Sequence, residues 1–193
     1  MNSMRLFAML LLIALRAHSA HAQLPRVRIH TTLGDIVAVI DTISAPVSAA
    51  NFLHYVDAGM YANGSFHRTV KPGNQPDNVV KIEVIQAGRD SARAGEFAAI
   101  PLERTSVTHL RHADGTVSMA RGGPDTATSE FFICIGDQPA LDYGGARNPD
   151  GQGFAAFGQV TSGMDVVRRI QQSPAQGQAL TPAIMIVNIE RVR

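Results

Sequence analysis

The amino-acid sequence predicts an all-β domain, folded as a barrel or a sandwich. Three observations lead to this prediction. Many short apolar or alternating runs are separated by turns rich in Gly and Pro, whereas only two segments have helical periodicity. The 193 residues, 45% hydrophobic and 17% charged, are typical of a globular chain. This length provides one domain with a full core and is short for two.

The first 22 residues have the pattern of a secretory signal peptide. Arg5 ends a short positive start, an apolar run of ten residues follows, and Ala20-His21-Ala22 forms an A-x-A cleavage site. An N-terminal membrane anchor is the weaker alternative, because a spanning helix needs roughly 20 apolar residues. We therefore predict a signal peptide over residues 1–22 and a mature domain over residues 23–193. We expect it in the periplasm, or beyond the cell, without stable membrane insertion after cleavage.

Charge and cysteine content narrow the classes of function. Removal of residues 1–22 leaves 15 of the 17 basic residues against 16 acidic ones, so the net charge is near −1. Because nucleic-acid-binding domains usually carry a basic stripe, we expect no nucleic-acid partner. The one cysteine, Cys134, lies among Phe and Ile residues. It is interpreted as a small apolar residue and not as a nucleophile.

The spacing of apolar residues near the N-terminus changes from two-residue alternation to helical spacing, which predicts a hairpin followed by a helix. Residues 26–40 contain two alternating runs joined at Leu33-Gly34-Asp35, which predicts a hairpin. The next segment has helical spacing, with Ser44 as the expected cap, Pro46 in the first turn and Gly59 at the end.

Further strands, a second helix and a last strand are predicted after this helix. The strands are expected at residues 64–70, 79–88, 115–120, 129–136, 153–160 and 182–193. Residues 71–78 contain two prolines and a glycine and are predicted to form a loop. The second helix is expected over residues 162–173, opened by Ser162 and closed by Ser173-Pro174. Closure of the first strand onto the last would remove exposed edges.

The common catalytic and metal-binding motifs are missing from the sequence. It contains no G-x-G-x-x-G, no G-x-x-x-x-G-K-[ST] and no G-x-S-x-G. His109 and His112 lack an adjacent glutamate, so we interpret them as surface-loop histidines and not as zinc ligands. Residues 148–151 read NPDG, part of a calcium loop, but Phe157 stands where the bidentate acid is needed. We expect no metal and no cofactor.

Apolar and hydrogen-bonding residues alternate on the strands in a way that predicts a surface site. Two-residue periodicity places them in same-face pairs: Phe66 with Arg68, Val84 with Gln86, and Glu130 with Phe132. If these strands are neighbours, the pairs form a shallow apolar pocket edged by hydrogen-bonding groups. Such a pocket suits a peptide better than a metal or a nucleotide. Each residue also has an ordinary interpretation, since an isolated arginine is usually solvated and Phe132 could pack under a loop.

Several motifs, in this order, resemble the cyclophilin family of peptidyl-prolyl isomerases. They are FHR (66–68), QAG (86–88), the run from SMA to SEFFI (118–133), LD (141–142) and FGQVTSGMDVV (157–167). The resemblance spans residues 27–189. It implies a cyclophilin of the exported bacterial kind, with an eight-stranded closed antiparallel β-barrel capped by two α-helices. It also places the substrate groove on the outer wall of the barrel.

The resemblance also implies the roles of the site residues. Arg68 matches the catalytic arginine, whose guanidinium would donate to the proline nitrogen as the amide twists. The implied substrate contacts are Phe132, Val84 and Leu141 for the proline ring, Gln86 for the substrate backbone, and Ala120, Arg121, Gly122 and Glu130 along the residues that precede proline.

Some positions depart from the family pattern. Ala140 stands in place of a usual tryptophan and Phe154 in place of a common histidine, and residues 143–152 are an insertion. Glu83 falls at the position of a pocket phenylalanine. We expect Val79 or Val80 to replace that ring, or the pocket to be shallower.

Glu130 and Arg121 replace a usual glutamine and asparagine. We hypothesise that these two charges pair across the groove and alter the preference for residues before proline.

The predicted function is peptidyl-prolyl cis-trans isomerisation in exported proteins during folding. The expected partners are proline-containing polypeptides, and the expected state is a monomer. One alternative, favoured by Glu83 and Ala140, is a catalytically weak peptide-binding chaperone on the same barrel. Another is a small-ligand barrel of lipocalin type. The inward-facing Phe131, Ile133 and Phe157, with Ile135, instead predict a filled interior.

Overall fold

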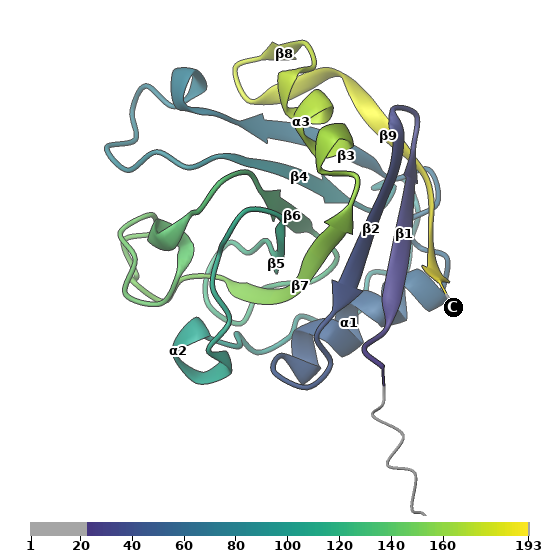
Figure 1. Ribbon diagram of the computed structural model, residues 1–193, viewed down its shortest axis with the longest axis horizontal. Helices are drawn as coiled ribbons and strands as arrows, with labels where there is room; N and C mark the ends of the chain where they lie inside the picture. Colours follow the sequence, from purple (N-terminus) through teal and green to yellow (C-terminus); the bar gives the residue numbers. More distant parts are fainter. Residues whose placement is uncertain (1–22, 193) are drawn as a thin grey trace, which may run out of the picture.

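The computed structural model describes residues 23–192, and within them eight strands form a closed antiparallel barrel (Figure 1). The order around the barrel is β1-β2-β7-β5-β6-β4-β3-β9, and pairing of β1 with β9 closes it. The short strand β8 pairs only with β9. The barrel confirms the fold predicted from the sequence. The proposed signal peptide, residues 1–22, lies outside the described residues.

The strand bounds are β1 (Arg26–Thr31), β2 (Gly34–Ile40), β3 (Ser65–Val70), β4 (Val84–Gly88), β5 (Thr116–Met119), β6 (Phe131–Cys134), β7 (Ala155–Ser162), β8 (Ala175–Gln176) and β9 (Ala179–Val192). The helices are α1 (Pro46–Asp57), α2 (Thr105–Thr108) and α3 (Met164–Gln172). Helices α1 and α3 are the two that the sequence predicts. The one-turn helix α2 was not predicted, because its sequence TSVT consists of poor helix formers. Helix α1 packs against β7 and β9, and α3 against β2, β3 and β4.

The N-terminus of α1 is capped by a residue far away in the sequence. The carboxylate of Glu103 accepts hydrogen bonds from the backbone N–H groups of Val47 and Ser48, at 2.9 and 2.7 Å. These N–H groups have no partner within the helix. The prediction of Ser44 as the cap is wrong, since the N-cap position is Ala45 and the Ser44 N–H donates to Asp41.

The start of α3 also differs from the prediction. Ser162 is the last residue of β7, and Gly163 occupies the N-cap position with φ +92°. A Cβ at Gly163 would collide with the backbone carbonyl of Asp35. The close approach of β2, together with the left-handed backbone, therefore requires glycine here.

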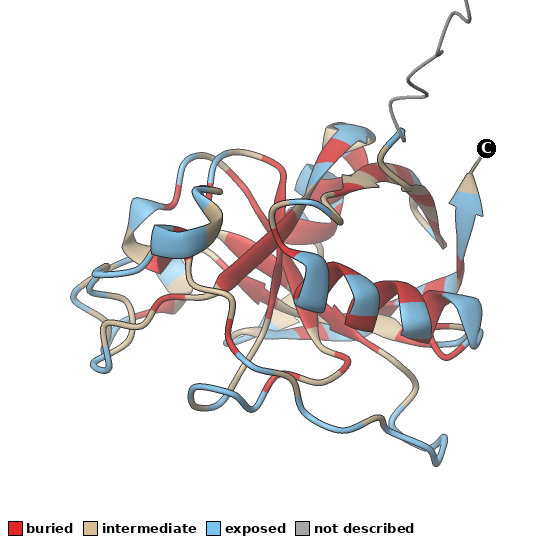
Figure 2. Ribbon diagram, turned by 90° about the horizontal axis from the view of Figure 1, so that it is seen from below, coloured by how far each residue is buried: buried red, intermediate tan, exposed pale blue. Residues whose placement is uncertain are grey.

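The barrel interior is filled with side chains. Phe131 and Ile133 from β6 and Phe157 from β7 are fully buried, and Ile135 is 8% exposed. The ring of Phe52 from α1 lies 5.3 Å from Phe131 and 5.2 Å from Phe157, centroid to centroid. Figure 2 shows one buried side of α1 directed to this core. The lipocalin-type alternative is therefore wrong, because these rings occupy the space that a ligand would need.

A second, smaller apolar cluster lies outside the barrel core, and Phe132 is at its centre. Its buried members are Val70, Ile82, Val84, Phe132, Cys134 and Leu141. Strand β6 thus has two apolar faces, with Phe131 inside the barrel and Phe132 outside it. Burial raises the pKa of the Cys134 thiol far above its usual range. Its surroundings confirm the interpretation of this cysteine as an apolar packing residue.

We predict that Glu103→Ala lowers the free energy of unfolding by about 1–2 kcal/mol, because two N–H groups of α1 lose their acceptor. Urea denaturation of residues 23–193 measures this. Glu103→Gln is the control, since it keeps one acceptor oxygen and should lose less. Equal stability of Glu103→Ala and the wild type would show that the helix does not depend on this cap.

Candidate functional site

A groove of about 490 Å³ lies on the outer wall of the barrel, and every residue that the sequence predicts for the site lines it. Strands β3, β4 and β6 supply its floor, while the loops after β5 and after residue 141 supply its rim. The lining residues that were not predicted as site residues are Ile82, Thr126, Thr128, Arg147, Asn148 and Phe154.

The floor of the groove is the small apolar cluster around Phe132. Val84, Leu141 and Phe132 are each at most 4% exposed. The ring of Phe154 meets Phe132 edge-on, with centroids 5.4 Å apart. These side chains give the groove a closely packed apolar floor.

Ile82 fills the position at which Val79 or Val80 was expected. Ile82 lines the groove and is 6% exposed, whereas Val79 is 98% exposed. The prediction of Val79 or Val80 is therefore wrong. The side chain of Glu83 accepts a hydrogen bond from Gln171 of α3 at 2.8 Å. Two-residue periodicity with Val84 could have identified Ile82, since residues two apart on an extended chain share a face.

Arg68 reaches the groove because of an irregularity in β3. The register with both β4 and β9 shifts between Phe66 and Arg68. The prediction that these two residues share a face is wrong. Phe66 is fully buried in the barrel core and Arg68 lines the groove. An extra residue at His67 accounts for this, because a β-bulge changes which face the following side chains occupy.

The guanidinium of Arg68 is held by two glutamine side chains. Its Nε and Nη2 donate to Oε1 of Gln178 at 2.9 and 2.6 Å, and its Nη1 donates to Oε1 of Gln86 at 2.9 Å. Gln178 lies just before β9 and was missed by the sequence analysis, since no local pattern marks it. Burial lowers the pKa of Arg68. Arginine nevertheless keeps its charge, so a fixed cation stands beside the apolar floor.

The hydrogen-bond chain continues from Gln86 to Glu130. Gln86 Nε2 donates to Glu130 Oε2 at 2.9 Å, and His67 Nε2 lies 3.3 Å from the same oxygen. The Glu130 carboxylate lies against Gly88, where a Cβ would collide with it. The glycine of the QAG motif therefore makes room for Glu130 and helps to fix its position.

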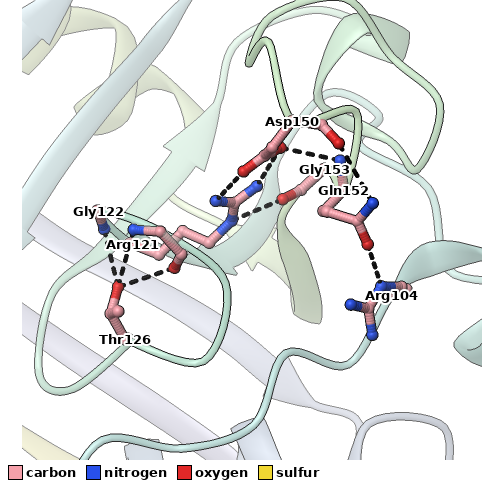
Figure 3. Close-up of polar contacts among 8 residues, drawn as sticks. Arg104, Arg121, Gly122, Thr126, Asp150, Gln152 and Gly153 are labelled. Atoms are coloured by element: carbon pink, nitrogen blue, oxygen red, sulfur yellow. Dashed lines mark hydrogen bonds and ion pairs between the residues drawn. The ribbon is translucent and has the colours of Figure 1, made fainter.

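Arg121 pairs with Asp150, so the hypothesis of an Arg121–Glu130 pair is wrong. Arg121 donates to both carboxylate oxygens of Asp150, at 2.8 and 3.0 Å, and to the carbonyl of Gly153 at 2.8 Å (Figure 3). Its guanidinium also lies 5.0 Å from the ring centroid of Phe154. The Arg121 side chain is 1% exposed. The Arg121 guanidinium therefore binds the end of the inserted segment, residues 143–152, and does not face the groove as a free charge.

The inserted residues form part of the groove wall. The backbone N–H of Arg147 donates to Ala140 O at 3.2 Å, and its Nη1 donates to Val80 O at 2.7 Å. Arg147 and Asn148 both line the groove. At the loop's far side, Gln152 accepts from Arg104 at 2.6 Å (Figure 3). The insertion therefore packs over Ala140 and does not project into solvent as a separate arm.

A buried polar chain supports Phe132 from behind. His112 is 2% exposed, so its interpretation as a surface-loop histidine is wrong. Its Nδ1 lies 2.7 Å from Asp142 Oδ1 and its Nε2 lies 2.9 Å from Ser118 Oγ. Its ring stacks on Phe132 with centroids 5.9 Å apart. These three residue types also form hydrolase triads, but Ser118 is fully buried and has no path to a substrate.

Two further observations concern all the residues that the structure describes. Residues 23–192 contain no cluster of three or more His, Cys, Asp or Glu side chains that could hold a metal ion. None of the helices that the structure describes is long and apolar enough to cross a membrane.

Comparison with known proteins gives a family match over nearly the whole described chain. The family model for "Cyclophilin type peptidyl-prolyl cis-trans isomerase/CLD" matches residues 26–191. A peptidyl-prolyl cis-trans isomerase of Acinetobacter baylyi is 37% identical over 159 residues, covering 81% of this chain and 77% of the relative. Peptidyl-prolyl cis-trans isomerase B of Escherichia coli is 33% identical over 147 residues, covering 75% and 83%.

Solved structures show the same fold. A cyclophilin type peptidyl-prolyl cis-trans isomerase of Cryptosporidium parvum has a TM-score of 0.71 and 24% identity, covering 88% of this chain and 98% of that one. The same protein, crystallised in the presence of the dipeptide Ala-Pro, has a TM-score of 0.70 and 24% identity, covering 87% and 99%.

We predict that Asp142→Asn destabilises the protein at pH 7 by about 1–3 kcal/mol, because His112 loses a charged partner. Burial alone would raise the pKa of Asp142, but the hydrogen bonds from the side chain and backbone of His112 outweigh it, and the pKa is lowered. A lowered pKa stabilises the fold above the unfolded value of about 4, and this contribution is lost as pH falls through the folded value.

The stability difference between wild type and Asp142→Asn should therefore shrink as the pH falls below about 4. Urea denaturation at several pH values between neutral and acidic conditions measures it. A difference that does not change with pH would contradict an ionised Asp142 stabilised by its hydrogen bonds from His112.

Proposed function

The chain belongs to the cyclophilin family of peptidyl-prolyl cis-trans isomerases, and from this premise we propose that Arg68 catalyses X-Pro rotation in exported proteins during folding. The observation that carries the proposal is the fixed guanidinium of Arg68 beside the apolar floor around Phe132.

The reaction needs a preorganised donor and no covalent chemistry. Rotation about an X-Pro bond has a barrier of about 18–20 kcal/mol, because twisting breaks amide resonance. Uncatalysed rotation takes roughly tens to hundreds of seconds. In the twisted amide the proline nitrogen regains its lone pair, and an enzyme that binds this form more tightly than the planar one lowers the barrier.

Arg68 has N–H groups left for this nitrogen. A guanidinium has five N–H donors. Three hydrogen bonds from Arg68 go to Gln178 and Gln86, so one N–H on each Nη remains for the substrate. Because the two glutamines already fix the guanidinium plane, little reorganisation is needed when the amide twists.

The other lining residues would hold the peptide on either side of the bond. We place the proline ring against Phe132, Val84 and Leu141. The substrate backbone would contact the remaining amide hydrogen of Gln86, since both other contacts of that amide go to Arg68 and Glu130. The residues before proline would lie along Ala120, Arg121 and Gly122, past the Glu130 rim. Arg121 would contribute its backbone there, because its guanidinium is buried against Asp150.

A catalytically weak peptide-binding chaperone is the second candidate, and Ala140 still favours it. Glu83 no longer does, because its side chain bonds to Gln171 and Ile82 occupies the pocket wall. The complete apolar floor and the held Arg68 favour catalysis over binding alone.

The export context is part of the proposal. We propose that cleavage after Ala22 releases a mature chain that begins at Gln23, works in the periplasm as a monomer and acts on proline-containing polypeptides. The A-x-A site and the short apolar run before it support this.

Expression of the full chain in a bacterium and N-terminal sequencing of the exported protein should give Gln23 as the first residue. A product that keeps Met1 would contradict export by cleavage.

We predict that Arg68→Ala lowers kcat/KM by roughly 30- to 1,000-fold, equivalent to about 2–4 kcal/mol, because one preorganised donor is lost. Exchange NMR on a short X-Pro peptide measures the rate. Arg68→Lys keeps the charge but not the planar fork, so its kcat/KM should lie between those of the wild type and Arg68→Ala. A loss below tenfold in Arg68→Ala would remove Arg68 from the mechanism.

A further inference from the structure

We propose that the groove prefers substrates with a carboxylate side chain directly after proline, and that Arg147 of the inserted residues is the residue that determines this preference. The inference rests on the proposed function, because it concerns the substrate of the same groove. It assigns a role to a side chain that lies in the insertion, outside the motifs that carry the family resemblance.

Arg68 and Arg147 are two cations without an acidic partner in one groove. Among the residues that the structure describes, the ion pairs within 4.0 Å include neither of them. Arg68 donates to glutamine amide oxygens and Arg147 to the carbonyl of Val80. Both side chains are partly buried, which weakens their solvation.

Both arginines line the same groove, and the positive charge of Arg68 acts on Arg147. Burial, and then the positive charge of Arg68, lower the pKa of Arg147. A pair of like charges at the edge of an apolar pocket is unfavourable until an anion is placed between them. A substrate carboxylate would be attracted by both cations and would relieve their repulsion.

Neither Glu130, which lines the groove, nor Asp150, which lies beside it in the insertion, serves as this anion. Glu130 is engaged by Gln86 and by His67. Asp150 is engaged by both Nη atoms of Arg121. Neither carboxylate contacts Arg68 or Arg147, whose hydrogen-bond partners are all neutral groups.

Arg147 is held in place before substrate binds. Its backbone N–H is bound to Ala140, and the loop that carries it is closed by a hydrogen bond of 2.8 Å from Gly144 N to Gly151 O. Arg121 anchors the end of the loop through Asp150. A preorganised charge contributes to selectivity because the loop does not have to be ordered on binding.

The direction of the peptide decides which residue meets Arg147. With the residues before proline along Ala120 and Gly122, as proposed above, the chain after proline runs toward Arg68 and Arg147. A carboxylate one residue after proline can then bind Arg147 and be attracted by the charge of Arg68, whose free N–H groups stay on the proline nitrogen.

The test uses blocked peptides, in which only a side chain carries the charge. Ala-Ala-Pro-Glu-Ala is compared with Ala-Ala-Pro-Gln-Ala, and Ala-Glu-Pro-Ala-Ala with Ala-Gln-Pro-Ala-Ala. Exchange NMR gives kcat/KM and chemical-shift titration gives Kd, both at low salt, for residues 23–193. We expect the Glu peptide to exceed the Gln peptide about fivefold when the charge follows proline, as for two partly exposed charge contacts. The ratio should approach one in about 1 M salt.

Variants assign the preference to Arg147. Arg147→Gln should reduce the Glu/Gln ratio to about two or below and Arg147→Glu should invert it, whereas Arg147→Lys should keep most of it. Arg169→Gln is the matched control. Arg169 also donates to a backbone carbonyl, that of Leu33, but lies on α3 outside the groove, so its loss should leave the ratio unchanged.

The outcomes separate this inference from the proposed function. Isomerisation of both peptides with a Glu/Gln ratio of one would overturn the inference and leave the function standing. No isomerisation of any peptide would contradict the function, and the Kd ratio would still decide the charge preference. A preference that survives Arg147→Gln, or one that appears only for a charge before proline, would overturn the role of Arg147.

Discussion

The filled interior of the barrel is the constraint on which the site depends. Phe52 from α1 contacts Phe131 and Phe157, and buried side chains fill the interior of the barrel in the described part of the chain. The groove in which we propose that the substrate binds lies on the outer wall, where β6 carries a second apolar face around Phe132. Strand β4 is hydrogen-bonded to β3 on one side and to β6 on the other. The side chains that these three strands project onto the outer wall therefore keep fixed separations.

The proposed catalysis depends on the position of one cation. A bulge in β3 turns Arg68 outward, and Gln178 and Gln86 set the plane of its guanidinium. Behind the floor, His112 stacks on Phe132 and is itself held by Asp142 and Ser118. These buried polar contacts fix the position of a hydrogen-bond donor relative to an apolar surface. Such an arrangement suits a reaction without covalent intermediates.

The barrel fold and the set of residues that line the groove could be predicted from the sequence. Both predictions follow from the periodicity of the strands and from a specific motif. Two errors of the sequence-based prediction come from contacts between residues far apart along the chain. Glu103 caps α1 from 55 residues away, and Asp150 holds Arg121 from 29 residues away. The bulge at His67 reversed the expected face of Phe66. Gln178 carries no local signal, since its role appears only where the chain before β9 meets β3.

Exchange NMR on a short X-Pro peptide, with small amounts of the protein (residues 23–193) present, measures whether the groove accelerates rotation about the X-Pro bond. We expect faster interconversion of the cis and trans forms at an unchanged equilibrium ratio. Peptide resonances that shift on binding without any faster exchange would contradict the proposed isomerase activity. They would show that the groove binds proline but does not stabilise the twisted amide.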